Sequence, residues 1–200
     1  RASGGIWLKV GATNILIAGK TVVIAGYGDC GKGIARRAAG MGAHVVITET
    51  NPVRALQAHM DGFIVEKMDA AATHGDVFIT VTGNKHVITL DHVKKMKQGA
   101  ILANSGHFNI EIDVDGIKKA LPVKKEIRQN VDKYGHVYII SEGRLVNLAA
   151  AEGHPSEVMA LSFCGQALAC EWLVTNAGLK NAVYTLPKEI DMHIAKIALD

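Results

Sequence analysis

A short apolar strand that leads through a glycine-rich turn into a helix constrains this chain more than any other feature. Residues 21–25 are apolar and mostly β-branched, as in a strand buried on both faces of a parallel sheet. Gly26, Gly28 and Gly31 follow in the spacing G-x-G-x-x-G, and residues 32–39 have a helical composition. This strand–turn–helix order predicts a dinucleotide-binding unit, because the same spacing elsewhere in a chain carries little information.

Each residue of this pattern has a physical reason. Gly26 permits a tight turn, Gly28 lets the backbone approach a pyrophosphate, and Gly31 allows close helix–strand packing. The phosphates would lie at a helix N-terminus, whose free N–H groups favour negative charge. A second apolar strand, residues 44–48, ends at Glu49, which would accept hydrogen bonds from the adenosine ribose and repel a 2′-phosphate. The sequence therefore favours NAD over NADP.

The residues leave two alternatives open at this point. A glycine-rich turn in an α/β protein without a nucleotide would have the same spacing. Arg54 lies about one helical turn past Glu49 and could reach a ribose or a phosphate. NAD remains the preferred cofactor, because a 2′-phosphate would meet Glu49 first.

Short apolar strands alternate with helical segments through the first half of the chain. This alternation is typical of βαβ units and predicts a three-layer αβα sandwich, a Rossmann-type doubly wound parallel sheet. The further strands are expected at residues 63–65, 76–81 and 100–104, with helices opened by Asn51-Pro52 and spanning 68–74 and 90–96.

The rest of the chain is less regular. We expect strands at residues 126–130 and 137–141 on either side of a turn at 133–136, a helix cap at Asp113 or Asp115, and helices over 155–175 and 189–198. The predicted organisation is a linker or hinge over residues 1–20, a nucleotide-binding domain over 21–150, and C-terminal helices over 151–200 that pack on the domain.

Composition excludes several classes of function. The formal net charge is only +3 and the basic residues are dispersed without interleaved aromatics, so a nucleic-acid partner is not expected. Three cysteines without metal-like spacing fit a reducing compartment, and no metal site is expected. No unbroken apolar run reaches the roughly 18–20 residues of a membrane span, and the first residues lack a signal-peptide pattern. A cytoplasmic protein without a membrane partner is the expectation.

Several segments resemble one family specifically and in the same order. The glycine loop has an Asp and a Lys among its glycines, as in S-adenosylhomocysteine hydrolases. The resemblance covers nearly all of residues 12–200 and identifies the chain with the NAD-binding domain of that family. It is carried by residues 12–20 (the hinge helix of the family), 26–33, 60–63, 80–84, 104–112, 142–148 and 153–156.

The resemblance implies roles for individual residues. Two histidines would face the substrate and take part in catalysis, and these are His107 and His154. The residues expected to bind NAD are Gly26, Gly28, Asp29, Cys30, Gly31, Lys32, Gly33, Glu49, Thr82, Asn84, Ser105, Gly106, His107 and Asn147. Cys30 is expected to fill a small apolar space over the helix start.

The family resemblance also implies an activity. Members of the family are thioether hydrolases that convert S-adenosylhomocysteine reversibly to adenosine and homocysteine, through transient oxidation of the substrate 3′-hydroxyl by tightly bound NAD. The resemblance therefore implies that the complete protein acts on a small-molecule substrate and forms a homo-oligomer. The family's substrate domain is absent here, Arg54 replaces an Asn of many members, and residues 1–11 do not match. The chain alone is therefore expected to bind NAD without turnover.

Two other classes share the glycine loop. The cofactor domain of a 2-hydroxyacid dehydrogenase would have the same loop and acid, but its Arg, acid and His set is not recognisable here. A non-catalytic NAD-binding regulatory module is the second alternative, although it would have no need of His107, His154 and Asn147.

Overall fold

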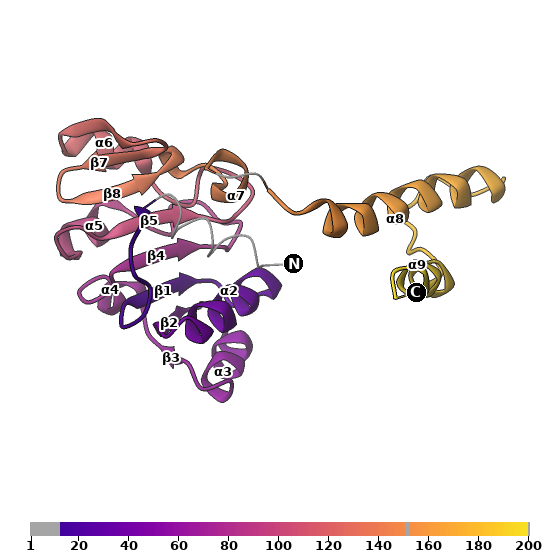
Figure 1. Ribbon diagram of the computed structural model, residues 1–200, viewed down its shortest axis with the longest axis horizontal. Coiled ribbons are helices and arrows are strands. Elements are labelled where there is room, and N and C mark those ends of the chain that lie inside the picture. Colours follow the sequence, from indigo (N-terminus) through magenta and orange to yellow (C-terminus); the bar gives the residue numbers. More distant parts are fainter. Residues whose placement is uncertain (1–12, 151–152, 200) are drawn as a thin grey trace. The chain divides into compact units, whose positions relative to one another are not determined.

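A computed structural model describes residues 13–150 and 153–199 of the chain, shown as a ribbon in Figure 1. The chain divides into two compact units, Arg1–Gly153 and His154–Asp200.

The first unit is built on one eight-stranded sheet, whose strands can be followed from β3 to β7 in Figure 1. Six neighbouring strands are parallel, and the last three of the order form antiparallel pairs at one edge. The predicted doubly wound parallel sheet is confirmed, with an antiparallel extension. The strands in spatial order are β3 (Ile64–Val65), β2 (His44–Thr48), β1 (Thr21–Ala25), β4 (Val77–Thr80), β5 (Ile101–Asn104), β8 (Val137–Ile140), β7 (Val131–Tyr134) and β6 (Val123–Arg128).

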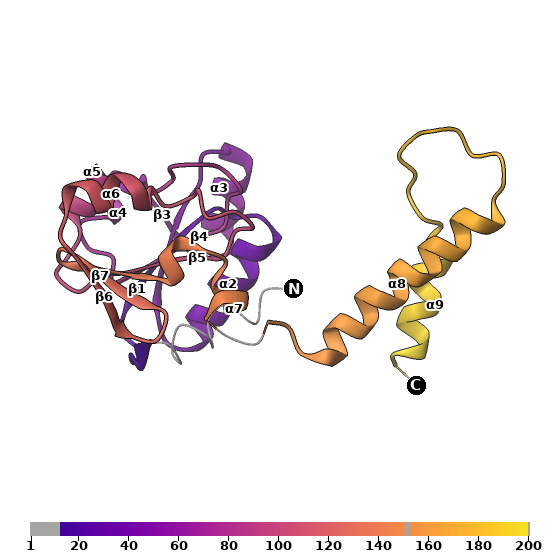
Figure 2. The same cartoon turned by 90° about the horizontal axis from the view of Figure 1, so that it is seen from above.

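Helices cover both faces of this sheet, so the predicted three layers are present. Figure 2 shows α4, α5 and α6 along one face and α2 and α7 along the other. Their bounds are α2 (Asp29–Gly40), α3 (Pro52–Met60), α4 (Met68–Ala71), α5 (Leu90–Lys95), α6 (Val114–Ala120) and α7 (Val146–Ala149), with a 3-10 turn η1 at Ser141–Gly143.

The central strands are buried on both faces because successive side chains point in opposite directions. Val23 and Phe78 pack with residues of α4, α5 and α6. Their neighbours Val22 and Ile24 pack with α2 and with Ala58 of α3. The apolar, β-branched strands of the sequence thus form two cores, one on each side of the sheet.

Side-chain caps fix the starts of two helices. Asn51 Oδ1 accepts hydrogen bonds from the backbone N–H groups of Val53 and Arg54, at 2.9 and 3.2 Å, and Pro52 occupies the first turn of α3. Asp113 caps α6 by accepting from Gly116 N–H at 3.0 Å. Both helix starts agree with the sequence prediction.

The predicted hinge helix over residues 12–20 is wrong in its described part. Thr13 is helical, but the chain leaves the helix at Asn14, whose φ is +53°. Gly19 has a φ of +75° and its N–H donates to Gly42 O at 2.9 Å. Positive φ angles break the helical hydrogen-bond ladder, and the segment instead forms a turn beside the end of α2.

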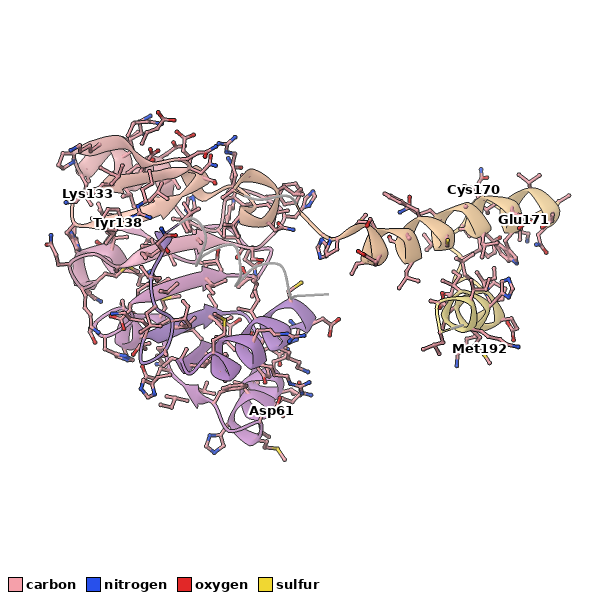
Figure 3. All side chains as sticks on the ribbon, in the orientation of Figure 1. Asp61, Lys133, Tyr138, Cys170, Glu171 and Met192 are labelled. Atoms are coloured by element: carbon pink, nitrogen blue, oxygen red, sulfur yellow. The ribbon has the colours of Figure 1, made fainter. Side chains whose placement is uncertain are left out.

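The antiparallel edge also differs from prediction. The strand predicted over residues 126–130 is present with other bounds, because β6 begins at Val123 and ends at Arg128, and Asn130 turns with a φ of +60°. The predicted turn at 133–136 is shorter, since Tyr134 pairs with Val137 across Gly135. Figure 3 labels two side chains of this hairpin, Lys133 and Tyr138, and the Lys133 ammonium lies 5.9 Å from the Tyr138 ring centroid.

The second unit contains two helices, α8 (Ser156–Thr175) and α9 (Lys188–Ile197), close to the predicted bounds. Neither helix has a buried residue, and Figure 3 labels Cys170 and Glu171 on α8 and Met192 on α9. By length and composition alone, α8 is the one described helix apolar enough to cross a membrane. The expectation that no such segment exists needs this correction, although helices that pack against protein meet the same criterion.

The two-sided core predicts a large difference between two phenylalanines. Phe78→Ala is expected to lower the free energy of unfolding by about 3–5 kcal/mol, because it empties a fully buried site in β4. The matched variant Phe108→Ala removes a ring that is 59% exposed. It should change the free energy of unfolding by less than about 0.5 kcal/mol. Urea unfolding measures both, and equal losses would contradict this description of the core.

Candidate functional site

The glycine-rich turn between β1 and α2 has no room for side chains at two of its positions. Gly26 has a φ of +106°, and a Cβ there would lie 3.0 Å from Val81 O. A Cβ on Gly31 would lie 2.0 Å from Gly26 O, so α2 rests directly on the end of β1. Gly28 differs, because the nearest atom to its Cβ position is Arg54 Nη1 at 3.9 Å. Its backbone faces open space, where a ligand can approach.

The N-terminus of α2 begins at this turn. Gly28 is its N-cap residue, and no side chain caps the helix there. The first N–H groups of a helix have no intrahelical acceptor, and together with the helix dipole they favour an anion. Lys32, in the first turns of α2, donates from Nζ to Gln57 Oε1 at 3.1 Å and lies 5.6 Å from the Tyr27 ring centroid.

Glu49 is held in place by backbone hydrogen bonds. Its Oε2 accepts from Tyr27 N–H at 2.8 Å, and its Oε1 accepts from Asn51 N–H at 2.9 Å. Burial alone would raise the pKa of this carboxyl, but the N–H groups of Asn51, Tyr27 and Thr50 and the charge of Arg54 lower it below its ordinary value. The side chain is thus a fixed anion at the end of β2.

A cavity of about 950 Å³ lies at the carboxyl ends of β1, β2 and β4. This is the switch point of the sheet, where the strand order reverses and open α/β folds bind their ligands. Its volume is large enough for a nucleotide. The predicted residues that line it are Gly26, Gly28, Glu49, Thr82 and Asn84, together with Arg54.

The loop after β5 carries the next group of predicted residues. Ser105 and Gly106 are half-buried, and Gly106 N–H donates to Asn104 Oδ1 at 2.7 Å. His107 is exposed, and its ring lies edge-on to Phe108 with centroids 4.7 Å apart. The imidazole is thus accessible to a molecule bound beside this loop.

Asn147 lies in α7, which follows the η1 turn. Its Oδ1 is buried and has no hydrogen-bond partner among residues 13–150 and 153–199. A buried amide oxygen without a donor costs free energy, so a ligand that donates a hydrogen bond there would bind favourably.

Comparison with known proteins identifies this arrangement. The sequence model described as S-adenosyl-L-homocysteine hydrolase, NAD binding domain, matches residues 8–153. The chain belongs to this family. The chain is similar to the adenosylhomocysteinase of Sulfolobus acidocaldarius, with 55% identity, and to that of Sulfurisphaera tokodaii, with 56%. Each comparison covers 94% of the chain and 47% of the relative, so the chain spans about half the length of these curated relatives.

Solved structures support the fold. A dipicolinate synthase component from Bacillus halodurans superposes with a TM-score of 0.54 at 22% identity, over 59% of this chain and 41% of that one. At this identity the likeness shows the Rossmann-type fold and no shared activity. The family assignment therefore comes from sequence, and with it NAD as the cofactor of this domain.

The predicted site residues of this NAD-binding domain fall into three groups. The cavity brings Gly26 and Gly28 together with Glu49, Thr82 and Asn84, whereas residues 29–33 lie in the first turns of α2 and not in the lining of the cavity. Ser105, Gly106 and His107 lie on the neighbouring loop after β5, and Asn147 lies in α7. His154 belongs to the second unit, so its role remains a prediction.

Two features escaped the sequence analysis. Cys30 is exposed rather than packed, since the buried stripe of α2 runs through Gly31, Ile34, Ala35 and Ala38. Glu111, which is fully buried, and Asn104 hold the loops of the site together. An acid between Ile110 and Ile112 was the one available signal, because a charged residue in an apolar segment needs buried partners.

The contact between Gly31 and Gly26 makes a prediction with an internal control. Gly31→Ala should lower the free energy of unfolding by about 1–3 kcal/mol, because its Cβ would overlap Gly26 O and push α2 from β1. Gly40→Ala, in the same helix with nothing within 4 Å, should raise it by up to about 1 kcal/mol. Denaturant unfolding measures the free energy of unfolding of both variants. A Gly31→Ala variant as stable as wild type would argue against the close approach of α2 to Gly26 O.

The lowered pKa of Glu49 predicts a pH dependence of stability. Its anion stabilises the fold above the carboxyl pKa of the unfolded chain, about 4.3, and this contribution is lost as pH falls through the lower pKa of the folded state. The difference in unfolding free energy between wild type and Glu49→Gln should be constant near neutral pH and shrink in that acidic window. Urea titrations at several pH values would test this, and a difference independent of pH would contradict it.

Proposed function

We propose that the first unit binds NAD in an extended conformation across the carboxyl ends of the sheet strands. Glu49 accepts hydrogen bonds from the adenosine ribose hydroxyls, while residues 28–33 hold the pyrophosphate at the start of α2. Gly26 and Gly31 are required for the turn, and Asp29, Cys30, Lys32 and Gly33 surround the phosphates. The observation that carries this proposal is the fixed Glu49 anion beside the uncapped N-terminus of α2.

The nicotinamide half would lie over β4 and β5. Thr82 and Asn84 contact the cofactor from the loop after β4, and Ser105, Gly106 and His107 from the loop after β5. The unpaired Oδ1 of Asn147 suits the carboxamide N–H₂ of nicotinamide, because it is an acceptor that lacks a donor. The residues present thus fit the cofactor at both of its ends.

The complete protein would act as an adenosylhomocysteinase, the name its relatives carry. When bound, NAD supplies a reversible hydride acceptor for the substrate 3′-hydroxyl. His107 would transfer protons at the substrate C5′, and His154 would contact the substrate. In this proposal the 200-residue chain binds NAD without turnover, and its C-terminal helices pack on the nucleotide-binding domain. The complete protein is a cytoplasmic homo-oligomer that acts on a small-molecule substrate.

Arg54 bears on cofactor choice. It lines the same cavity as Glu49, and its charge contributes to the lowered pKa of that carboxyl. In other Rossmann-type domains an arginine near the ribose site accommodates the 2′-phosphate of NADP. Here both Glu49 oxygens are fixed by N–H donors, so the anion cannot swing away from a 2′-phosphate, and NAD is favoured.

Calorimetric titration with NAD and NADP tests the proposed site. Wild type should bind NAD at least tenfold more tightly than NADP, and Glu49→Ala should lose at least tenfold in NAD affinity, because two ribose hydrogen bonds to a charged acceptor disappear. Asp91→Ala, an exposed acid in α5, is the matched control and should bind as wild type does.

Three results would contradict the proposal. These are equal affinity for the two nucleotides, an unchanged Glu49→Ala variant, and hydrolysis of S-adenosylhomocysteine by the chain alone. Adding adenosine and a separately expressed substrate domain of the family separates a regulatory module from an enzyme. Only an enzyme then reduces the nicotinamide, which absorbance reports.

A further inference from the structure

Glu111 is a buried carboxylate on which the loop after β4 converges. It is fully inaccessible to solvent. Its Oε2 accepts from Thr82 N–H at 2.9 Å and from Thr82 Oγ1 at 2.8 Å, and its Oε1 accepts from Gly83 N–H at 2.8 Å. Three donors on one buried carboxylate form a strong, charge-assisted cluster that water cannot replace.

The same carboxylate touches the loop after β5. A Cβ on Gly106 would lie 1.7 Å from Glu111 Oε1, so only a glycine lets this backbone pass the carboxylate. Gly106 precedes His107, the exposed histidine of the site. Glu111 therefore sets the separation between the loop of Thr82 and the loop of His107.

Asn104 extends this contact to a third loop. Its Oδ1 accepts from Gly106 N–H at 2.7 Å and from Thr80 Oγ1 at 3.1 Å. Its Nδ2 donates to Phe108 O at 2.7 Å and to Gly143 O at 3.0 Å. The η1 turn containing Gly143 leads directly to α7, which carries Asn147.

The backbone around Glu111 is itself fixed. His86 N–H donates to Ile110 O at 2.8 Å, and Ile88 N–H donates to Glu111 O at 3.1 Å. Ile112 is buried and pairs with Ile88 in an isolated bridge. His86 and Ile88 lie in the loop after β4 and Glu111 lies in the loop after β5, so these backbone hydrogen bonds and the buried carboxylate together fix the two loops to each other.

We infer that Glu111 is a positioning residue for the nicotinamide half of the cofactor site, and that it acts with Asn104 by holding the loops after β4 and β5 in register. This inference rests on the proposed binding of NAD, and it goes further by giving a role to a side chain that is buried beneath the cleft. Glu49, proposed for the adenosine half, is fixed instead by the N–H groups of Tyr27 and Asn51, and among the described residues it makes no hydrogen bond to Glu111 or Asn104.

Glu111→Gln separates the two halves of the site. The side chain keeps its size, but its N–H₂ group cannot accept, so at least one loop N–H loses its partner. NAD affinity should fall at least tenfold, while the affinity for AMP, which needs only the adenosine half, should stay within twofold of wild type. Amide hydrogen exchange at Thr82 and Gly83 should accelerate.

Asp115→Ala is the matched control, because it removes an exposed acid of α6 that forms no hydrogen bond or ion pair with either loop among the described residues. It should leave the affinities for NAD and AMP unchanged. If Glu111→Gln is unfolded by circular dichroism, Thr80→Val and Thr80→Ser replace it. Thr80→Val removes the buried hydrogen bond to Asn104 Oδ1 and should weaken NAD selectively, whereas Thr80→Ser, which keeps the hydroxyl, should bind NAD as wild type does.

The outcomes are distinct. A Glu111→Gln variant that binds NAD within twofold of wild type, or that loses NAD and AMP equally, would overturn the positioning role. Equal NAD affinities of Thr80→Val and Thr80→Ser would do the same. Wild-type chain that binds neither NAD nor AMP would instead refute the proposed function.

Discussion

The close approach of α2 to the end of β1 is the constraint on which the rest of the site depends. Gly31 lies against the Gly26 carbonyl, and the helix therefore begins directly at the edge of the parallel sheet. Gly28, the N-cap residue of this helix, lines the cavity at the switch point, where a helix N-terminus favours an anion. Because β1 is central and buried on both faces, neither the strand nor the helix start can shift to accommodate a larger residue.

Buried and half-buried carboxylates organise the cleft on both sides of this point. Glu49 is held by the N–H groups of Tyr27 and Asn51 at the adenosine side, and Glu111 holds those of Thr82 and Gly83 at the other. In the first case the backbone fixes a carboxylate that faces the ligand. In the second a buried carboxylate of the loop after β5 orients the backbone of the loop after β4. Backbone donors and charged acceptors thus preorganise the site without its ligand.

The elements of the fold were accessible from sequence where local signals agree. The strands at 21–25 and 44–48 are runs of β-branched residues, and the starts of α3 and α6 carry Asn-Pro and Asp signals. Prediction failed where the backbone takes unusual angles. Asn14, Gly19 and Asn130 have positive φ, which ended a predicted helix and moved a predicted strand boundary. Short strands such as β7 are set by pairing with neighbours, and a single sequence does not contain that information.

The sequence by itself determined the βαβ order, the glycine turn, the acid at the end of β2 and the family, since these depend on residues near one another in the chain. Only the tertiary structure decided which side chains meet. Glu111 contacts Thr82 across 29 positions, and Asn104 contacts Gly143 across 39. The exposure of Cys30 and the unpaired oxygen of Asn147 were decided in the same way. Burial and hydrogen bonding are properties of packed neighbours, and packing brings distant segments together only once the sheet has formed.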